Sequence, residues 1–131
     1  MTIGQCHWAI AEGYIPASST GGDDRRFVSH ETLCLLNANY KIAHLELTLF
    51  FSDRDPVGPF HVEVPARRTR HLRLNDLDDP ERVPRDTDYA CAIESDLPIV
   101  VQHTRLDSRQ AELALMTTIA YSQADGISST P

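Results

Sequence analysis

The sequence predicts an all-β protein, an antiparallel β-sandwich of about eight short strands. Apolar and polar residues alternate at period two in several segments, the pattern of strands with one buried face. Turn-forming residues separate many of these segments, and no long helical pattern alternates with them, which argues against a parallel α/β sheet. The 131 residues suffice for one domain with its own core, expected to span 1–122 and to be followed by a disordered tail over 123–131.

Each expected strand follows from its residue pattern. The clearest alternation lies in residues 43–51, 60–64 and 71–74. The remaining strand segments are 6–11, 27–36, 89–93, 98–104 and 112–121. The last could equally begin a helix, but its Thr-Thr-Ile run favours a strand. Residues 17–24 have the composition of a loop.

The two clearest strands also predict their own register. Both must bury their apolar residues on one face, and a slip by one residue would expose the whole set. Pairing Leu49 with Phe60 satisfies this condition. The same register places Thr48 opposite His61 on the other face, and Glu46 opposite Glu63.

Composition restricts the class of protein. The formal net charge of −7 argues against broad nucleic-acid binding, which depends on neutralising phosphates. No apolar run approaches the roughly 20 residues of a spanning helix, and the first residues do not resemble a secretory signal. The three widely spaced cysteines, Cys6, Cys34 and Cys91, do not indicate disulfides, and the apolar stretches around Cys34 and Cys91 favour buried thiols. We therefore expect a cytoplasmic protein without membrane insertion.

Two His-x-Glu segments raise the question of a metal site. His44-x-Glu46 and His61-x-Glu63 lie on expected strands, and histidine with carboxylate can hold a divalent ion. Neither segment has the H-x-H spacing followed by a glutamate that cupin-type sites use. Polar side chains are expected on a wet strand face in any case, so the prediction is no metal.

A basic cluster lies between the strands, with Arg67, Arg68, Arg70 and Arg73. Guanidinium groups suit phosphates, carboxylates and sugar hydroxyls. An acidic run over 76–81 follows at once, so a local ion-pair network is the simpler interpretation. No interleaved aromatic residues support a single-strand nucleic-acid platform.

Three polar segments beside apolar strands form the candidate binding site: 8–14, 29–32 and 101–110. Polar groups at the end of a buried strand are costly unless they are paired or serve a ligand. Carboxylates, guanidinium groups and an aromatic ring are the groups that bind sugars. The alternative for each segment is a buried polar network without a ligand.

Catalysis has weaker support. The chain has no G-x-S-x-G elbow and no phosphate-cradling glycine loop. Glu12, Glu31 and Asp107 could supply paired acids for glycoside cleavage, although spacing alone does not show it. We therefore predict a non-enzyme that needs no cofactor.

Long stretches of the chain carry a family resemblance. They are residues 8–16, 29–32, 36–38, 52–53, 56–59, 64–69, 75–77, 98–112 and 118–121. Through them the chain resembles the Anabaena sensory rhodopsin transducer family, from about Ile3 to Tyr121. The stretch ending at Glu112 is the most specific, and the 17–26 loop and the residues after 121 depart from the pattern.

The resemblance implies a small, soluble, jelly-roll-like β-sandwich that forms a homotetramer. It implies the cytoplasmic face of a sensory rhodopsin as the partner of the cyanobacterial member, and small molecules, above all sugars, as ligands of relatives without a rhodopsin. The ligand-binding residues it nominates are Trp8, Glu12, His30, Glu31, Arg67, Asn75, His103, Arg105 and Asp107.

These observations lead to three functional hypotheses. The leading one is a non-catalytic, cytoplasmic signal-transduction module that binds a sugar or related metabolite, with Trp8 either a platform for the sugar ring or simply part of the core. The second is a soluble transducer that docks on a sensory rhodopsin or another membrane receptor. The third is an enzyme such as a glycosidase or sugar isomerase.

Overall fold

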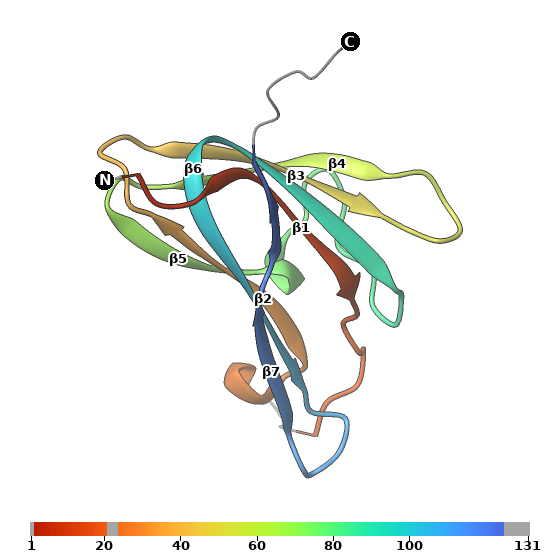
Figure 1. Cartoon of the computed structure of the whole chain (residues 1–131). Helices are drawn as coiled ribbons and strands as arrows, with labels where there is room; N and C mark the ends of the chain where they lie inside the picture. Colours follow the sequence, from red (N-terminus) through yellow and green to blue (C-terminus); the bar gives the residue numbers. More distant parts are fainter. Residues whose placement is uncertain (1, 21–23, 125–131) are drawn as a thin grey trace.

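The computed structural model describes residues 2–20 and 24–124 and is almost entirely β (Figure 1). Its strands are β1 (Gln5–Gly13), β2 (His30–Asn37), β3 (Ala43–Phe50), β4 (Val57–Val64), β5 (Arg68–Arg73), β6 (Tyr89–Asp107), β7 (Ala114–Ile119) and β8 (Tyr121–Gln123). Two short 3₁₀ helices, η1 (Arg25–Phe27) and η2 (Leu74–Asp76), lie between them. The expected all-β fold with eight strands is confirmed.

All observed strand pairs are antiparallel, and β6 connects two sheets. The first sheet, which we call sheet A, has the order β4-β3-β6-β1-β8. The second, sheet B, has β2 paired with β5 and β6, and β7 paired with β6. The first half of β6 therefore belongs to sheet A and its second half to sheet B.

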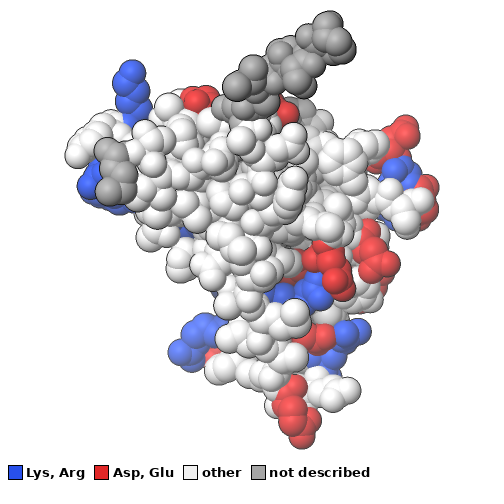
Figure 2. All heavy atoms as spheres, in the orientation of Figure 1, with Lys and Arg blue, Asp and Glu red and all other residues white. Residues whose placement is uncertain are grey.

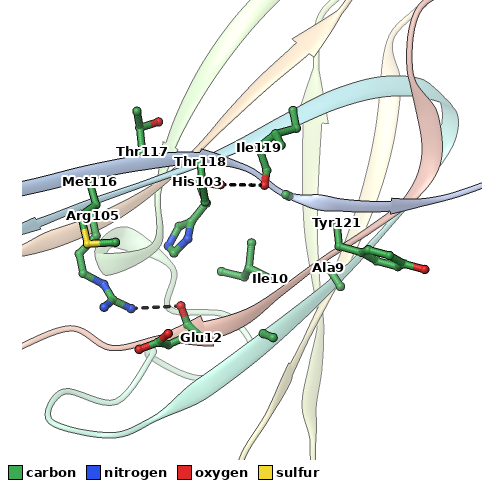
Figure 3. A pocket seen from close by; sticks show the side chains of 12 residues that line it. Ala9, Ile10, Glu12, His103, Arg105, Met116, Thr117, Thr118, Ile119 and Tyr121 are labelled. Atoms are coloured by element: carbon green, nitrogen blue, oxygen red, sulfur yellow. Dashed lines mark hydrogen bonds between the residues drawn. The ribbon is translucent and has the colours of Figure 1, made fainter.

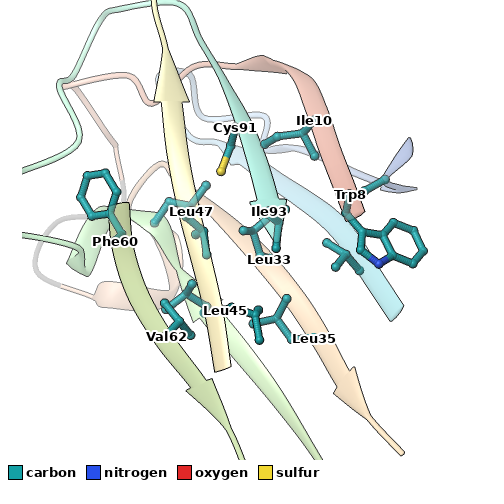
Figure 4. Close-up of a cluster of buried hydrophobic side chains, with 14 of the residues drawn as sticks. Trp8, Ile10, Leu33, Leu35, Leu45, Leu47, Phe60, Val62, Cys91 and Ile93 are labelled. Carbon is teal, nitrogen blue, oxygen red and sulfur yellow. The ribbon is translucent and has the colours of Figure 1, made fainter. Parts of the chain in front are cut away.

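The core lies between the inner faces of the two sheets (Figure 4). Leu33 and Leu35 of sheet B pack in one buried cluster with Leu45, Leu47 and Ile93 of sheet A. Each of these buried residues alternates along its strand with less buried ones, as period-two alternation predicts. Burial of such side chains contributes about 1.5–3 kcal/mol each, so this cluster is the main source of stability.

The segments expected as two strands, 89–93 and 98–104, are one continuous strand. The polar residues before Pro98 suggest a turn in the sequence, but here they mark the point where β6 leaves sheet A for sheet B. The pairing of β1 with β6 shifts at the same point, between the pairs His7–Glu94 and Gln5–Ile99. A long strand that serves both sheets places residues of 99–107 beside those of β1.

The predicted register of β3 and β4 is wrong by two residues. Phe60 pairs with Leu47 instead of Leu49, and Glu46 lies opposite His61 instead of Glu63. The faces remain as expected, because a shift of two residues keeps every side chain on its side. The shift arises because β4 begins at Val57, within the segment expected to turn.

Gly58 makes that early start possible. A Cβ on Gly58 would lie 2.8 Å from the backbone oxygen of Leu47, a contact that only glycine avoids. The register is irregular at this point, since Leu49 pairs with Val57 while Leu47 pairs with Phe60. The irregularity lets three additional residues, 57–59, join the strand at its start.

Other boundaries differ in detail. The strand expected over 27–36 begins at His30, after η1, and the expected turn at Asn75 lies in η2. The 112–121 segment is strand, as favoured, but it divides at Ala120, whose N–H donates to the Val101 oxygen at 3.1 Å. Gln123, expected in the tail, belongs to β8, and residues 125–131 lie outside the described residues, as do 21–23 of the expected loop.

Candidate functional site

Glu31 is the centre of a buried polar cluster. Its side chain has no exposed area, and the His103 side chain is only 9% exposed. Nε2 of His103 lies 2.5 Å from Glu31 Oε1, and Nε of Arg105 donates to Oε2 at 3.3 Å. The backbone N–H of Tyr14 donates to Oε2 as well. Both carboxylate oxygens are therefore partnered, which offsets the cost of removing the charge from water.

Strand pairing brings these groups together from distant parts of the sequence. In the register of β2 and β6, Glu31 lies opposite Arg105, and Leu33 lies opposite His103. Residues that face each other in this way share a side of the sheet, here the inner one. The polar cluster therefore continues the row of buried leucines toward the start of β2.

Asn75 holds the backbone at this end of β2. Its Oδ1 accepts a hydrogen bond from the Glu31 N–H at 3.2 Å, and its Nδ2 donates to the Ser29 oxygen at 3.0 Å. The Ser29 hydroxyl in turn lies 3.1 Å from the hydroxyl of Ser108, after β6. These contacts position Glu31 without touching its carboxylate.

A pocket of about 280 Å³ lies beside this cluster, between β1, β6 and the segment 116–121 (Figure 3). Its lining residues are Ala9, Ile10, Ala11, Glu12, His103, Arg105, Met116, Thr117, Thr118, Ile119, Ala120 and Tyr121. Exposed Glu12 and Met116 are among them, so the pocket reaches the surface. The walls are mostly apolar, and Arg105, which also donates to the Glu12 backbone oxygen at 3.1 Å, defines a polar end with His103.

Tyr89 adds an unusual buried hydroxyl near the cluster. Its ring packs directly against Gly13, where a Cβ would approach the ring to 2.3 Å. The hydroxyl oxygen is buried and has no hydrogen-bond partner among the described residues. Burial, reinforced by the Glu31 carboxylate, raises the pKa of Tyr89 well above its usual value. The phenol therefore stays neutral and retains an unused hydrogen-bonding capacity.

This arrangement is suited to binding a small polar molecule. Guanidinium, imidazole and carboxylate groups at one end can orient hydroxyl or anionic groups, and the apolar walls can cover a ring face. A metal is a poorer fit, because no group of three or more histidine, cysteine or acidic side chains in 2–20 and 24–124 is placed to hold one.

Five of the nominated residues belong to this site. Glu31, His103 and Arg105 form the cluster, Glu12 lines the pocket and Asn75 supports the Glu31 backbone. The remaining four lie elsewhere.

Trp8 and Arg67 make contacts within the fold, away from the pocket. Trp8 is part of the core, and its indole N–H is shared between the backbone oxygens of Gln5 and Ile99. Arg67 lies between β4 and β5, by the opposite end of β2 from Glu31, where it donates to the Ala38 oxygen at 2.8 Å. The nominated set is thus divided along the length of the sandwich.

His30 and Asp107 flank the cluster without joining it. His30 lies on the opposite face of β2 from Glu31. Burial lowers the pKa of His30, and the charges of Arg73 and Arg25 lower it further. The hydrogen bond with the Val28 oxygen raises the pKa but does not outweigh these effects. Hydrogen bonds from Arg109 lower the pKa of Asp107, at the end of β6. Both side chains therefore have local partners.

Sequence reasoning missed the contribution of β7. Met116 pairs with Arg105, and Thr118 pairs with His103, so both face the pocket. Tyr89 was also missed, since it belongs to an apolar alternation. Tyr14 lies in the expected 8–14 segment but was not nominated, and it contributes its backbone N–H to the Glu31 carboxylate. The signal available in the sequence was Tyr89 itself, a hydroxyl on the buried face of a strand.

The same segment also forms an exposed apolar surface. Leu115, Met116, Ile119 and Tyr121 are between 60% and 69% exposed. Among the described residues β7 pairs only with β6, so its second edge is open. Figure 2 shows a broad area without charged side chains over β1, β8 and the upper part of β7. Contiguous exposed apolar residues of this kind are typical of interaction surfaces.

Fold and site together define a class: a small antiparallel β-sandwich with a mostly apolar pocket, polar at one end, beneath an edge strand that also carries exposed apolar residues. The family model described as Anabaena sensory rhodopsin transducer matches residues 3–122. The chain belongs to this family. No curated protein matches the sequence.

Two solved structures are similar to the chain. One is the Anabaena sensory rhodopsin transducer, with 58% identity, a TM-score of 0.74, and coverage of 85% of this chain and 96% of that one. The other is protein 1070 of Thermotoga maritima, with 35% identity, a TM-score of 0.82, and coverage of 94% and 98%. In the part of the chain that is described, no helix is long and apolar enough to cross a bilayer.

Proposed function

We propose that the chain is a soluble transducer that docks on the cytoplasmic face of a membrane receptor of the sensory rhodopsin class. The observation that carries this proposal is the open edge of β7 with its exposed apolar residues. Family membership supports the proposal, because the Anabaena relative is by name the transducer of a sensory rhodopsin. This was the second of the sequence-based hypotheses, and it now has better support than the first.

A second candidate function, sensing of a small molecule, is favoured by the pocket. Its polar end presents Arg105 and His103, and its volume of about 280 Å³ suits a compact metabolite. A sugar or related metabolite fits this mixture of polar and apolar groups. The role is non-catalytic in this proposal, since Glu31 is already bound by three protein groups.

Strand β7 would couple the two functions. Met116 and Thr118 line the pocket, while the exposed Leu115 of the same strand does not. A ligand that repositions the lining residues therefore changes the exposed apolar surface. In this proposal the chain is located in the cytoplasm. It also forms a homotetramer, because several copies would present several docking surfaces to one receptor.

Docking is tested with the full chain and a sensory rhodopsin from the same genome, reconstituted in nanodiscs. Biolayer interferometry should show binding that is absent with empty nanodiscs. The double variant Leu115→Ser and Ile119→Ser should weaken binding at least tenfold, because it removes apolar contact area. Ile42→Ser, exposed between β2 and β3, is the matched control and should bind normally.

Two results would contradict this use of β7. One is equal binding of the double variant and the control. The other is a fall in molar mass of the double variant by light scattering, which would assign the surface to contacts between copies of the chain.

Ligand binding is tested by calorimetry with a panel of neutral and acidic monosaccharides. Arg105→Gln should weaken the best binder at least tenfold, whereas Arg67→Gln should not. Absence of heat from every sugar with the folded parent chain would eliminate the sugar proposal and leave docking unaffected.

A further inference from the structure

The outer face of sheet A carries two transverse rows of titratable side chains. One row crosses β4, β3, β6 and β1 as His61, Glu46, Glu94 and His7. The next row crosses β4, β3 and β6 as Glu63, His44 and Asp96. We call these the histidine–carboxylate rows. Together they line one surface hollow of about 700 Å³ with Leu45, Val62 and Ser95, and no lysine or arginine of residues 2–20 and 24–124 lines it.

Within the rows the histidine nitrogens lie between 3.0 and 3.9 Å from carboxylate oxygens. Nδ1 of His44 lies 3.0 Å from Asp96 Oδ2, and its Nε2 lies 3.6 Å from Glu63 Oε1. Nδ1 of His61 lies 3.9 Å from Glu46 Oε1. These side chains are at least half exposed. They are therefore accessible to a partner.

One contact in the rows is unfavourable for the isolated chain. Glu46 and Glu94 lie directly opposite each other on neighbouring antiparallel strands. Like charges in that position oppose strand pairing. The histidines at either end of the row reduce this repulsion only when they are protonated. At neutral pH a cation placed above Glu46 and Glu94 would reduce the repulsion between them.

The geometry restricts what that cation can be. Among the described residues no three of these side chains are placed to hold a metal ion. A second copy of the chain is disfavoured on this face, because a two-fold contact would set carboxylates against carboxylates. A hollow of this size with charges spread over four strands suits several separated positive charges instead.

We propose that the histidine–carboxylate rows are a docking surface for a Lys- or Arg-rich segment of another protein. The proposal deepens the docking function above and rests on it only for the identity of the partner. Cytoplasmic loops of membrane proteins carry an excess of lysine and arginine, so a receptor loop has the required charge. Attraction between opposite surfaces speeds encounter and sets orientation.

The same surface responds to pH. Four carboxylates and three histidines face the hollow, so its charge is −4 with neutral histidines and −1 with all three protonated (−4 + 3 = −1). β8 adds only the uncharged Gln123 beside His7, and Arg70 of β5 reaches the backbone oxygen of Glu63 at the edge. Histidine changes charge between pH 5 and 8, whereas lysine and most carboxylates do not. Protonation of the histidines therefore weakens the attraction between this surface and a basic segment.

The experiment uses the full chain and fluorescein-labelled octalysine, followed by fluorescence anisotropy in EDTA at pH 8.0 and pH 5.5. Binding should be at least tenfold weaker at the lower pH. Glu46→Gln with Glu94→Gln should weaken binding at pH 8.0 by about tenfold. Asp78→Asn with Asp79→Asn is the matched control, with the same change in net charge elsewhere on the surface, and should change binding less than twofold.

The pH response has its own variant. Replacing His7, His44 and His61 together by glutamine should keep binding at pH 5.5 within about twofold of that at pH 8.0. Circular dichroism confirms that each variant is folded.

Three outcomes would overturn the proposal: no binding of octalysine at pH 8.0, equal losses in the glutamate and aspartate variants, or an unchanged pH response in the histidine variant. Retained nanodisc binding by the glutamate variant would overturn this surface as the receptor contact and leave the docking function intact. Octalysine binding without any binding to the rhodopsin nanodiscs would remove the docking function alone.

Discussion

Two histidine–carboxylate pairs in this chain have the same chemistry and opposite surroundings. Glu31 and His103 meet at 2.5 Å with side-chain exposures of 0% and 9%. His44 and Asp96 meet at 3.0 Å with exposures of 59% and 52%. The inner pair belongs to a network completed by Arg105 and a backbone N–H, whereas the outer pair faces water.

The difference lies in what each pair can do. A buried charge must keep its partners, because losing one leaves the other uncompensated in a poorly hydrated place. An exposed pair contributes little to stability, since water and salt replace the partner cheaply. The inner pair therefore shapes the fold and the pocket, and the outer pair is available to a binding partner.

The largest expected effect follows from breaking the inner pair. Glu31→Gln removes the negative charge that its three partners share and should lower the free energy of unfolding by about 3 kcal/mol. The exposed change Glu46→Gln serves as control and should stay within about 0.5 kcal/mol. Urea unfolding of both variants measures the contrast, and equal effects would refute the distinction.

A smaller change in the free energy of unfolding, of opposite sign, is expected at Tyr89 beside the same cluster. Tyr89→Phe removes a buried hydroxyl that has no partner among the described residues, and should raise the free energy of unfolding by about 1 kcal/mol. If the hydroxyl instead contacts a ligand, the variant binds that ligand more weakly. Destabilisation of the ligand-free variant in thermal unfolding would contradict the geometry of the hydroxyl.

Tyr89 also predicts the alkaline behaviour of the chain. Its pKa is raised in the folded state, so its stabilising contribution is complete below the unfolded pKa of about 10. That contribution is lost as pH rises from 10 toward the folded-state value. The parent chain should therefore lose stability above pH 10 more steeply than Tyr89→Phe does, which unfolding midpoints at pH 9 and pH 11 would show.

The smallest effect is expected at the outer pair. Partial burial works to raise the pKa of Asp96, but hydrogen bonds from the His44 N–H and ring outweigh it and lower the pKa. Its stabilising contribution is therefore present above about pH 4 and is lost as the pH falls further. Asp96→Asn at pH 7 should cost less than about 1 kcal/mol in urea unfolding. A larger loss of unfolding free energy would show that the outer rows stabilise the fold.

The fold was largely predictable because period-two alternation marks the strands that bury one face, such as β3 and β4. The register of β3 and β4 was not, since Leu49 and Leu47 are equivalent partners for Phe60 and the start of β4 depends on a close approach at Gly58. The continuity of β6 through Pro98 was also hidden, because polar residues before a proline normally indicate a turn.

The site was predictable where polar residues interrupt apolar strands. Glu31, His103 and Arg105 stand out for that reason, and strand pairing brings them together. Met116 and Thr118 could not be found, since their role depends on which edge of β6 the last strand joins. Trp8 could not be separated from the site by sequence, because an aromatic residue on a strand suits a core and a ligand platform equally.

The central claim is that burial, not chemistry, separates the structural pair from the pair available for binding. Double-mutant cycles on Glu31→Gln with His103→Gln, and on Asp96→Asn with His44→Gln, measure both couplings in the same chain. We expect a coupling free energy of at least about 2 kcal/mol for the inner pair and below about 0.5 kcal/mol for the outer pair. Equal couplings, or a larger one on the outer face, would contradict the account.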